Sequence, residues 1–168
     1  MAGLGIQPSG TRWTHWLPRE YNDAADSLAT RAMDQLTSRL WVSQDWPKLR
    51  KRQLVIFSDA GLRRSAGPGT SCGGLGLIIM TRGDWRCVCV AIGQFVVALP
   101  SGGTVELEVN RLELQALSGA LGPLATLCAG REEEMRRTVE ATFERSCIRT
   151  LRDRVVHAAG RAAAAGVL

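Results

Sequence analysis

Residues 53–80, QLVIFSDAGLRRSAGPGTSCGGLGLIIM, contain two apolar runs separated by a turn-rich segment. The first run, 53–58, is continuous and fits a buried strand that ends at Asp59. The second run, 74–80, fits another strand, and the glycine-rich segment between the two provides the turn. A third strand is expected within residues 86–99, where Val and Ile recur. Three strands joined by short loops predict an antiparallel meander.

Helices are expected before and after this meander in the sequence. Residues 22–36 place their apolar side chains on one helical stripe behind Asn22, which is a favourable N-cap, and a short strand is expected at 11–17. After the meander, a helix is expected from Asn110, and residues 131–157 show apolar residues at steps of four, typical of one amphipathic helix. No strand is expected after residue 109. The pattern predicts an α/β fold with a mixed sheet and flanking helices.

Composition limits the class of protein. The chain has 168 residues, of which 45% are hydrophobic, and a net charge of +5 that comes almost wholly from arginine. We expect an intracellular protein, neither secreted nor membrane-spanning, because the first residues lack the charge and apolar core of a signal peptide and no long apolar run occurs. The five cysteines show no CxxC spacing, which argues against a disulfide framework or a zinc site.

These patterns divide the chain into five expected segments. They are a disordered tail at 1–10, a strand and helix at 11–37, a basic linker at 38–52, the core at 53–157 and a frayed tail at 158–168. The linker contains Trp41, Trp46 and the basic run KLRKR, so an aromatic and basic patch for a nucleic-acid backbone is the alternative reading.

Three acidic residues are candidates for a catalytic site: Asp59 after a buried strand, Glu113 in the first turn of a helix, and Asp26 in the first turn of another helix. Each also has a structural explanation. Glu113 could complete a capping box with Asn110, Asp59 could close a turn, and Asp26 could complement its helix dipole. Three carboxylates from three elements would also suit a pair of divalent cations acting on a phosphodiester.

Three stretches resemble the ribonuclease H type 1 family, particularly its retroelement members. The segment 56–80 is similar to that family's first hairpin, VNRLELQALSGAL at 109–121 to its Asn-Arg-x-Glu-Leu helix, and PREYNDAADSLATRA at 18–32 to its closing helix. The resemblance implies Mg²⁺- or Mn²⁺-dependent cleavage of the RNA strand of an RNA–DNA hybrid. It also implies that Asp59, Glu113 and Asp26 are catalytic metal ligands.

The resemblance implies roles for four further residues. Asn110 and Arg111 match positions that face the hybrid backbone, Asn22 matches a capping position beside the last carboxylate, and His15 lies one residue from the family's flexible histidine. The order of the motifs departs from the family, because the closing helix precedes the first hairpin. The family's second aspartate, at the start of its fourth strand, has no match.

Two architectures explain the inverted order. Either residues 11–36 fold back beside the strand of Asp59 and complete one permuted site, or the chain joins the end of one such domain to the start of another. The alternatives to hydrolysis are binding of nucleic acid without cleavage by a catalytically inactive remnant, and docking of the 131–157 helix on another protein.

Overall fold

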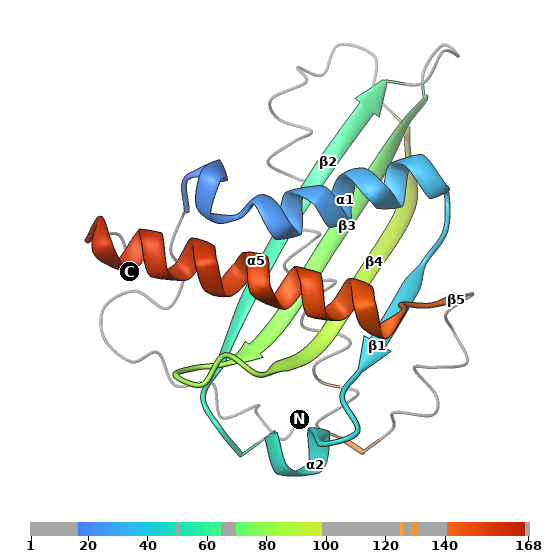
Figure 1. Ribbon diagram of the computed structural model, residues 1–168. Helices are drawn as coiled ribbons and strands as arrows, with labels where there is room; N and C mark the ends of the chain where they lie inside the picture. Colours follow the sequence, from blue (N-terminus) through green and yellow to red (C-terminus); the bar gives the residue numbers. More distant parts are fainter. Residues whose placement is uncertain are drawn as a thin grey trace.

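The computed structural model describes residues 17–49, 51–64, 70–98, 125, 129–130 and 141–166. Its elements, in chain order, are η1 (Arg19–Tyr21), α1 (Asp23–Gln35), β1 (Arg39–Val42), α2 (Trp46–Leu49), β2 (Leu54–Arg64), β3 (Thr70–Thr81), β4 (Cys87–Ala98), β5 (Ala141–Thr142) and α5 (Arg145–Ala164). The fold is mixed α and β, with α1 and α5 lying across one face of a sheet (Figure 1). None of the described helices is long and apolar enough to cross a membrane.

The predicted three-stranded meander is confirmed. Strands β2, β3 and β4 pair antiparallel in sequence order, and the complete sheet has the order β2-β3-β4-β1-β5. β1 pairs antiparallel with β4, and the two-residue β5 pairs parallel with β1. The sequence predicted that the first strand ends at Asp59, and this is wrong, because β2 continues to Arg64.

Helix α1, predicted at 22–36, packs tightly against β2 and β3. Gly74 and Gly76 of β3 permit this contact: a Cβ atom would lie 2.1 Å from the carbonyl oxygen of Ala29 at the first position and 2.2 Å from that of Ala25 at the second. Because neither position has room for a side chain, the helix backbone rests directly on the strand. The glycines of the quoted segment therefore determine where α1 lies.

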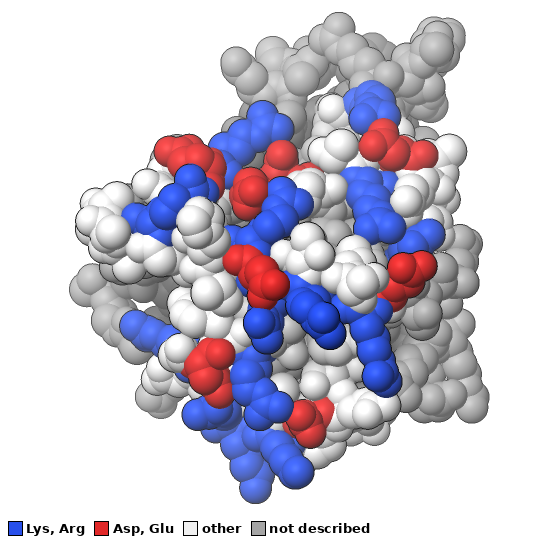
Figure 2. All heavy atoms as spheres, in the orientation of Figure 1, with Lys and Arg blue, Asp and Glu red and all other residues white. Residues whose placement is uncertain are grey.

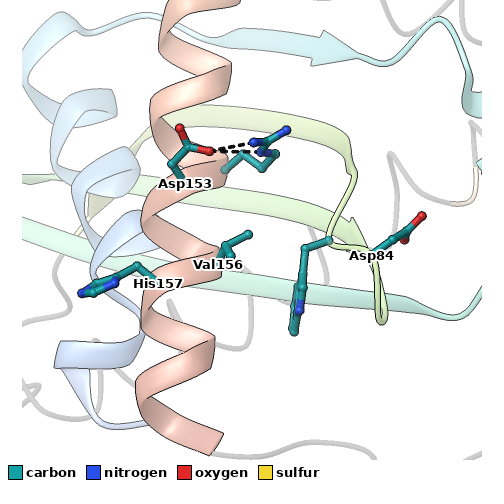
Figure 3. A pocket seen from close by; sticks show the side chains of 6 residues that line it. Asp84, Asp153, Val156 and His157 are labelled. Carbon is teal, nitrogen blue, oxygen red and sulfur yellow. Dashed lines mark hydrogen bonds and ion pairs between the residues drawn. The ribbon is translucent and has the colours of Figure 1, made fainter.

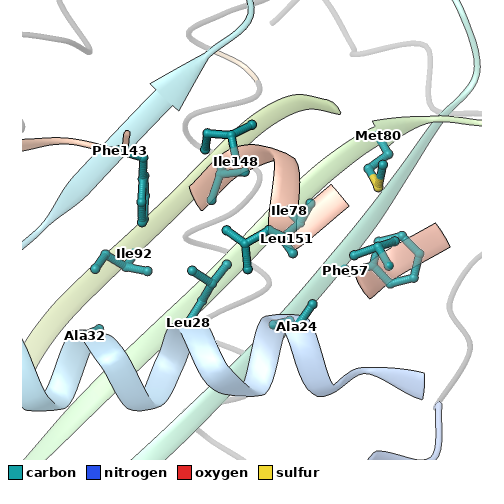
Figure 4. Close-up of a cluster of buried hydrophobic side chains, with 13 residues drawn as sticks. Ala24, Leu28, Ala32, Phe57, Ile78, Met80, Ile92, Phe143, Ile148 and Leu151 are labelled. Carbon is teal, nitrogen blue, oxygen red and sulfur yellow. The ribbon is translucent and has the colours of Figure 1, made fainter. Parts of the chain in front are cut away.

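A hydrophobic core fills the space between this face of the sheet and the two helices. α1 contributes Leu28 and small alanines, the strands contribute Phe57, Ile78 and Ile92, and α5 contributes Leu151 (Figure 4). All of these side chains are buried. The core holds α1 and α5 on the same side of the sheet.

The segment 38–52 is not a solvated linker, and that prediction was wrong. It contains β1 and α2, and the side chains of Trp46 and Leu49 in α2 are 1% and 2% exposed. They pack in a second core on the opposite face of the sheet, with Leu77 and Ile79 of β3. The basic run is therefore attached to a short element whose apolar residues are part of the core.

The C-terminal part differs from its prediction in three ways. β5 is a strand beyond residue 109, and α5 begins only at Arg145, after the buried Phe143. The expected frayed tail is helical to Ala164, and it buries Ala158 and Ala162. The expected strand at 11–17 and the start of the 131–157 helix lie outside the described residues, apart from Leu17.

Candidate carboxylate site and arginine-lined hollow

Asp59 lies within β2 on the face that α1 covers. Its neighbours on the same face are Phe57 and Gly61, because side chains alternate along a strand, and its partner across the ladder is Gly76. One carboxylate oxygen of Asp59 accepts a hydrogen bond from the backbone N–H of Ala60 at 2.9 Å. Asp59 therefore lies beside one of the two glycines at which α1 rests on the sheet.

Asp26, in the first turn of α1, is held by Arg19. One guanidinium nitrogen, Nη2 of Arg19, donates to both carboxylate oxygens of Asp26, each at 3.0 Å. The hydrogen bond and the charge of Asp26 raise the pKa of Arg19, and the charge of Asp59 adds to this effect. The guanidinium of Arg19 therefore lies in the field of both carboxylates.

Asn22 joins the start of α1 to the strand that carries Asp59. Its side-chain nitrogen donates to the carbonyl oxygen of Ser58 at 3.1 Å. It occupies the N-cap position, as expected, but its side chain makes no capping hydrogen bond to the helix. The capping role expected from the sequence is thus replaced by a tie between α1 and β2.

The structure joins Asn22, four residues before Asp26, to Ser58, the residue before Asp59, although Asp26 and Asp59 are 33 positions apart in sequence. The other predicted site residues lie outside the described residues: Glu113, Asn110, Arg111 and His15. In the part of the chain that the structure describes, no three His, Cys, Asp or Glu side chains lie close enough together to hold a metal ion.

The second acid in the first turn of α1, Asp23, has a structural contact. Arg154 of α5 donates to its carboxylate at 2.9 Å, to its backbone oxygen at 3.3 Å and to the hydroxyl of Ser27 at 3.1 Å. These bonds fasten α5 to the start of α1. Asp23 and Asp26 therefore have different partners, Arg154 of α5 for Asp23 and Arg19 of η1 for Asp26.

Four arginines surround a surface hollow of about 240 Å³ at the N-terminal end of α5. They are Arg86, Arg145, Arg149 and Arg152, and the hollow is also lined by Trp41, Ser43, Cys87 and Ile148. Figure 2 shows basic side chains gathered over α5 and the strand ends beside it. Sequence reasoning missed this group, although Arg145, Arg149 and Arg152 have the spacing of one helical face.

A neighbouring hollow of about 420 Å³ lies between the β3–β4 turn and the middle of α5 (Figure 3). It shares Arg152 with the arginine-lined hollow, and Asp84, Asp153 and His157 also line it. Its two carboxylates make it less favourable for an anion. They form an acidic boundary on that side of the arginine-lined hollow.

Comparison with known proteins adds no external assignment to this geometry. No family model, no curated protein and no solved structure matches the chain.

Proposed function

We propose that the chain is a ribonuclease H-like, metal-dependent endonuclease that hydrolyses the RNA strand of an RNA–DNA hybrid. The observation that carries the proposal is the position of α1. It lies across β2 and β3, and Asn22 at its start donates a hydrogen bond to the carbonyl oxygen of Ser58, the residue before Asp59, so that the first turn carrying Asp26 is tied to this part of β2. Two carboxylates carried by segments that are tied together in this way would favour a positive charge between them.

Asp59, Asp26 and Glu113 would hold Mg²⁺ or Mn²⁺. Their carboxylate oxygens are the hard donors that these cations take, and Asp26 already holds a cationic group, the guanidinium of Arg19. When bound, the cation supplies stabilisation of the charge that develops on the phosphodiester oxygens as water displaces the ester oxygen. Arg19 is mostly exposed, so its ion pair with Asp26 is weak and yields readily to a more highly charged cation.

The second candidate function is binding of nucleic acid without cleavage. The observation that favours it is the same ion pair: Arg19 neutralises Asp26 without any added cation. A chain of this kind would retain the basic surface and lose hydrolysis. The two functions differ in what they require of Asp59, because only hydrolysis needs its carboxylate.

A cleavage assay separates the two functions. The full chain is incubated with end-labelled RNA–DNA hybrid, single-stranded RNA and double-stranded DNA, in Mg²⁺, in Mn²⁺ and in EDTA. The variants are Asp59→Asn and Asp26→Asn, with Asp34→Asn as the matched control. Asp34 lies on the same helix and pairs with Arg63 in an exposed ion pair away from Asp59.

Hydrolysis is expected with the hybrid and a divalent cation only. Asp59→Asn and Asp26→Asn should each reduce it by roughly a hundredfold or more, since removal of a metal ligand costs several kcal/mol of transition-state stabilisation. Asp34→Asn should retain full activity. Hydrolysis that survives Asp59→Asn would refute the site. No hydrolysis by a folded chain that still binds hybrid would establish the second function instead.

A further inference from the structure

The arginine-lined hollow is assembled from three separate elements. Arg145, Arg149 and Arg152 come from α5, Arg86 immediately precedes β4, and Trp41 of β1 contributes an apolar wall. Burial of Ile148 and Leu151, which are 6% and 5% exposed, holds this end of α5 against the sheet. The arginines are therefore carried on a packed framework.

The charge of the group is only partly neutralised. Arg86 pairs with Asp45 at 2.7 Å and Arg152 with Asp153 at 2.9 Å, both in exposed pairs, whereas Arg145 and Arg149 make no ion pair with any described residue. Four arginines and two aspartates leave a charge of +2 around the hollow. The first turn of α5 contains no acidic residue, and Glu144 at the N-cap offsets only part of the positive end of the helix dipole beside this charge.

This arrangement is unfavourable for the free protein. Like charges four residues apart on a helix repel each other, and cations are disfavoured at a helix N-terminus. An anion bound in the hollow would relieve both effects. Arginine is suited to phosphate, because its planar group donates two parallel hydrogen bonds to the phosphate oxygens.

The spacing of the arginines indicates more than one phosphate. Arg145 and Arg152 are seven positions apart, which is about 10 Å along a helix axis. One strand of a nucleic-acid duplex advances about 3.4 Å per nucleotide along the duplex axis, so a row lying along that axis spans roughly three nucleotides. We propose that Arg86, Arg145, Arg149 and Arg152 bind successive backbone phosphates of one nucleic-acid strand.

This inference rests on the proposed function only for its class of partner, and it does not require the carboxylates. The row ends two residues from Arg154, whose bonds to Asp23 fasten α5 to the start of α1. The row would position the backbone, and it would take no part in hydrolysis.

The test is a binding measurement in EDTA, where hydrolysis does not contribute. A fluorescein-labelled RNA–DNA hybrid is titrated with the full chain over a series of salt concentrations. The test variant is Arg145→Gln/Arg149→Gln. The control is Arg63→Gln/Arg82→Gln, which changes the net charge equally at residues that do not line the hollow.

The expected losses follow from counterion release. Each lost phosphate contact lowers the slope of log K against log salt by about 0.9, so the double variant should lower it by about 1.8 and weaken binding roughly 60-fold at 0.1 M salt. The control should lose far less affinity. Arg145→Lys/Arg149→Lys should keep the slope, because it preserves both charges.

Any one of the following binding results would overturn the inference: no binding of hybrid by the unchanged chain, no weakening in the test variant, equal weakening in the control, or equally tight binding of polyglutamate of matched charge. Thermal unfolding of each variant shows whether weaker binding results from a less stable fold. Because the arginines repel each other, the test variant should melt no lower than the unchanged chain. A lower melting temperature together with weaker binding would show a structural role and would also overturn the inference.

Discussion

Replacing Gly76 by alanine tests the contact on which both the fold and the carboxylate site depend. The new Cβ would lie 2.2 Å from the carbonyl oxygen of Ala25, 2.7 Å from the amide nitrogen of Ala29 and 2.7 Å from Cβ of Leu28. Ordinary contact begins near 3.4 Å, so α1 must retreat by about 1 Å. Two of the three obstructing atoms belong to the helix backbone, which cannot rotate away.

The cost of this substitution combines two terms of opposite sign. Overpacking of a core costs roughly 1–3 kcal/mol, and we take the upper value because the obstruction is backbone. Alanine recovers up to about 1 kcal/mol, since glycine is less favourable in a strand. The expected net loss in free energy of unfolding is about 2 kcal/mol, which corresponds to a melting temperature lower by roughly 4–8 °C for a chain of this size.

Urea unfolding followed by circular dichroism measures this loss, with Gly93→Ala as the control. Gly93 lies in β4, and a Cβ there would meet no atom within 4 Å. The control should therefore gain about 0.5 kcal/mol from the alanine alone. If Gly76→Ala is as stable as Gly93→Ala, the close approach of α1 to β3 is wrong, and so is the neighbourhood of Asp26 and Asp59 built on it.

Three further predictions concern other parts of the fold. Burial raises the pKa of the Cys87 thiol from 9.0 to about 12, and the charge of Arg152 opposes this shift. The contribution of the protonated thiol to the free energy of unfolding is therefore complete below pH 9 and is lost as the pH rises toward 12. Urea unfolding at pH 8 and pH 10 should show that Cys87→Ala removes about 1.4 kcal/mol of the alkaline loss; equal losses in both proteins would contradict this. Leu49→Ala should lower the free energy of unfolding by about 3 kcal/mol in the same assay, because Leu49 is 2% exposed. An unchanged free energy of unfolding would instead support the prediction that residues 38–52 are a solvated linker. Gly160→Ala should add about 0.5–1 kcal/mol by calorimetry, since it lies within α5 in open space, and a loss would show an unexpected contact there.

The parts of the fold that the sequence predicted are those with strong local patterns. The continuous apolar runs around Phe57 and Ile78 specify buried strands, and the stripe through Leu28 specifies a helix. β1 and α2 were missed because each has only four residues. No periodicity can develop over that length, and the burial of Trp46 arises from a sheet face that only the tertiary structure supplies. The apolar residues spaced four apart suggested one helix through Phe143. Phe143 is buried, but it lies before the first residue of α5.

The candidate site divides in the same way. Asp26 and Asp59 could be selected from sequence, because each follows a recognisable motif. Their shared relation to Arg19 could not be predicted, since it depends on α1 lying over β2. The arginine-lined hollow was missed for a similar reason. Arg86 is 59 positions from Arg145, and only the packing of α5 beside β1 and β4 brings them together.

Strand β3, which lies between β2 and β4, links the two sides of the sheet. Its consecutive residues Ile78 and Ile79 are both 0% exposed, one in the core beneath α1 and α5 and the other in the core that contains Trp46. Neither core can therefore melt while the other stays intact, because they share the backbone of one strand. The chain should unfold as one cooperative unit, in which the helical layer and the α2 layer are lost at the same denaturant concentration.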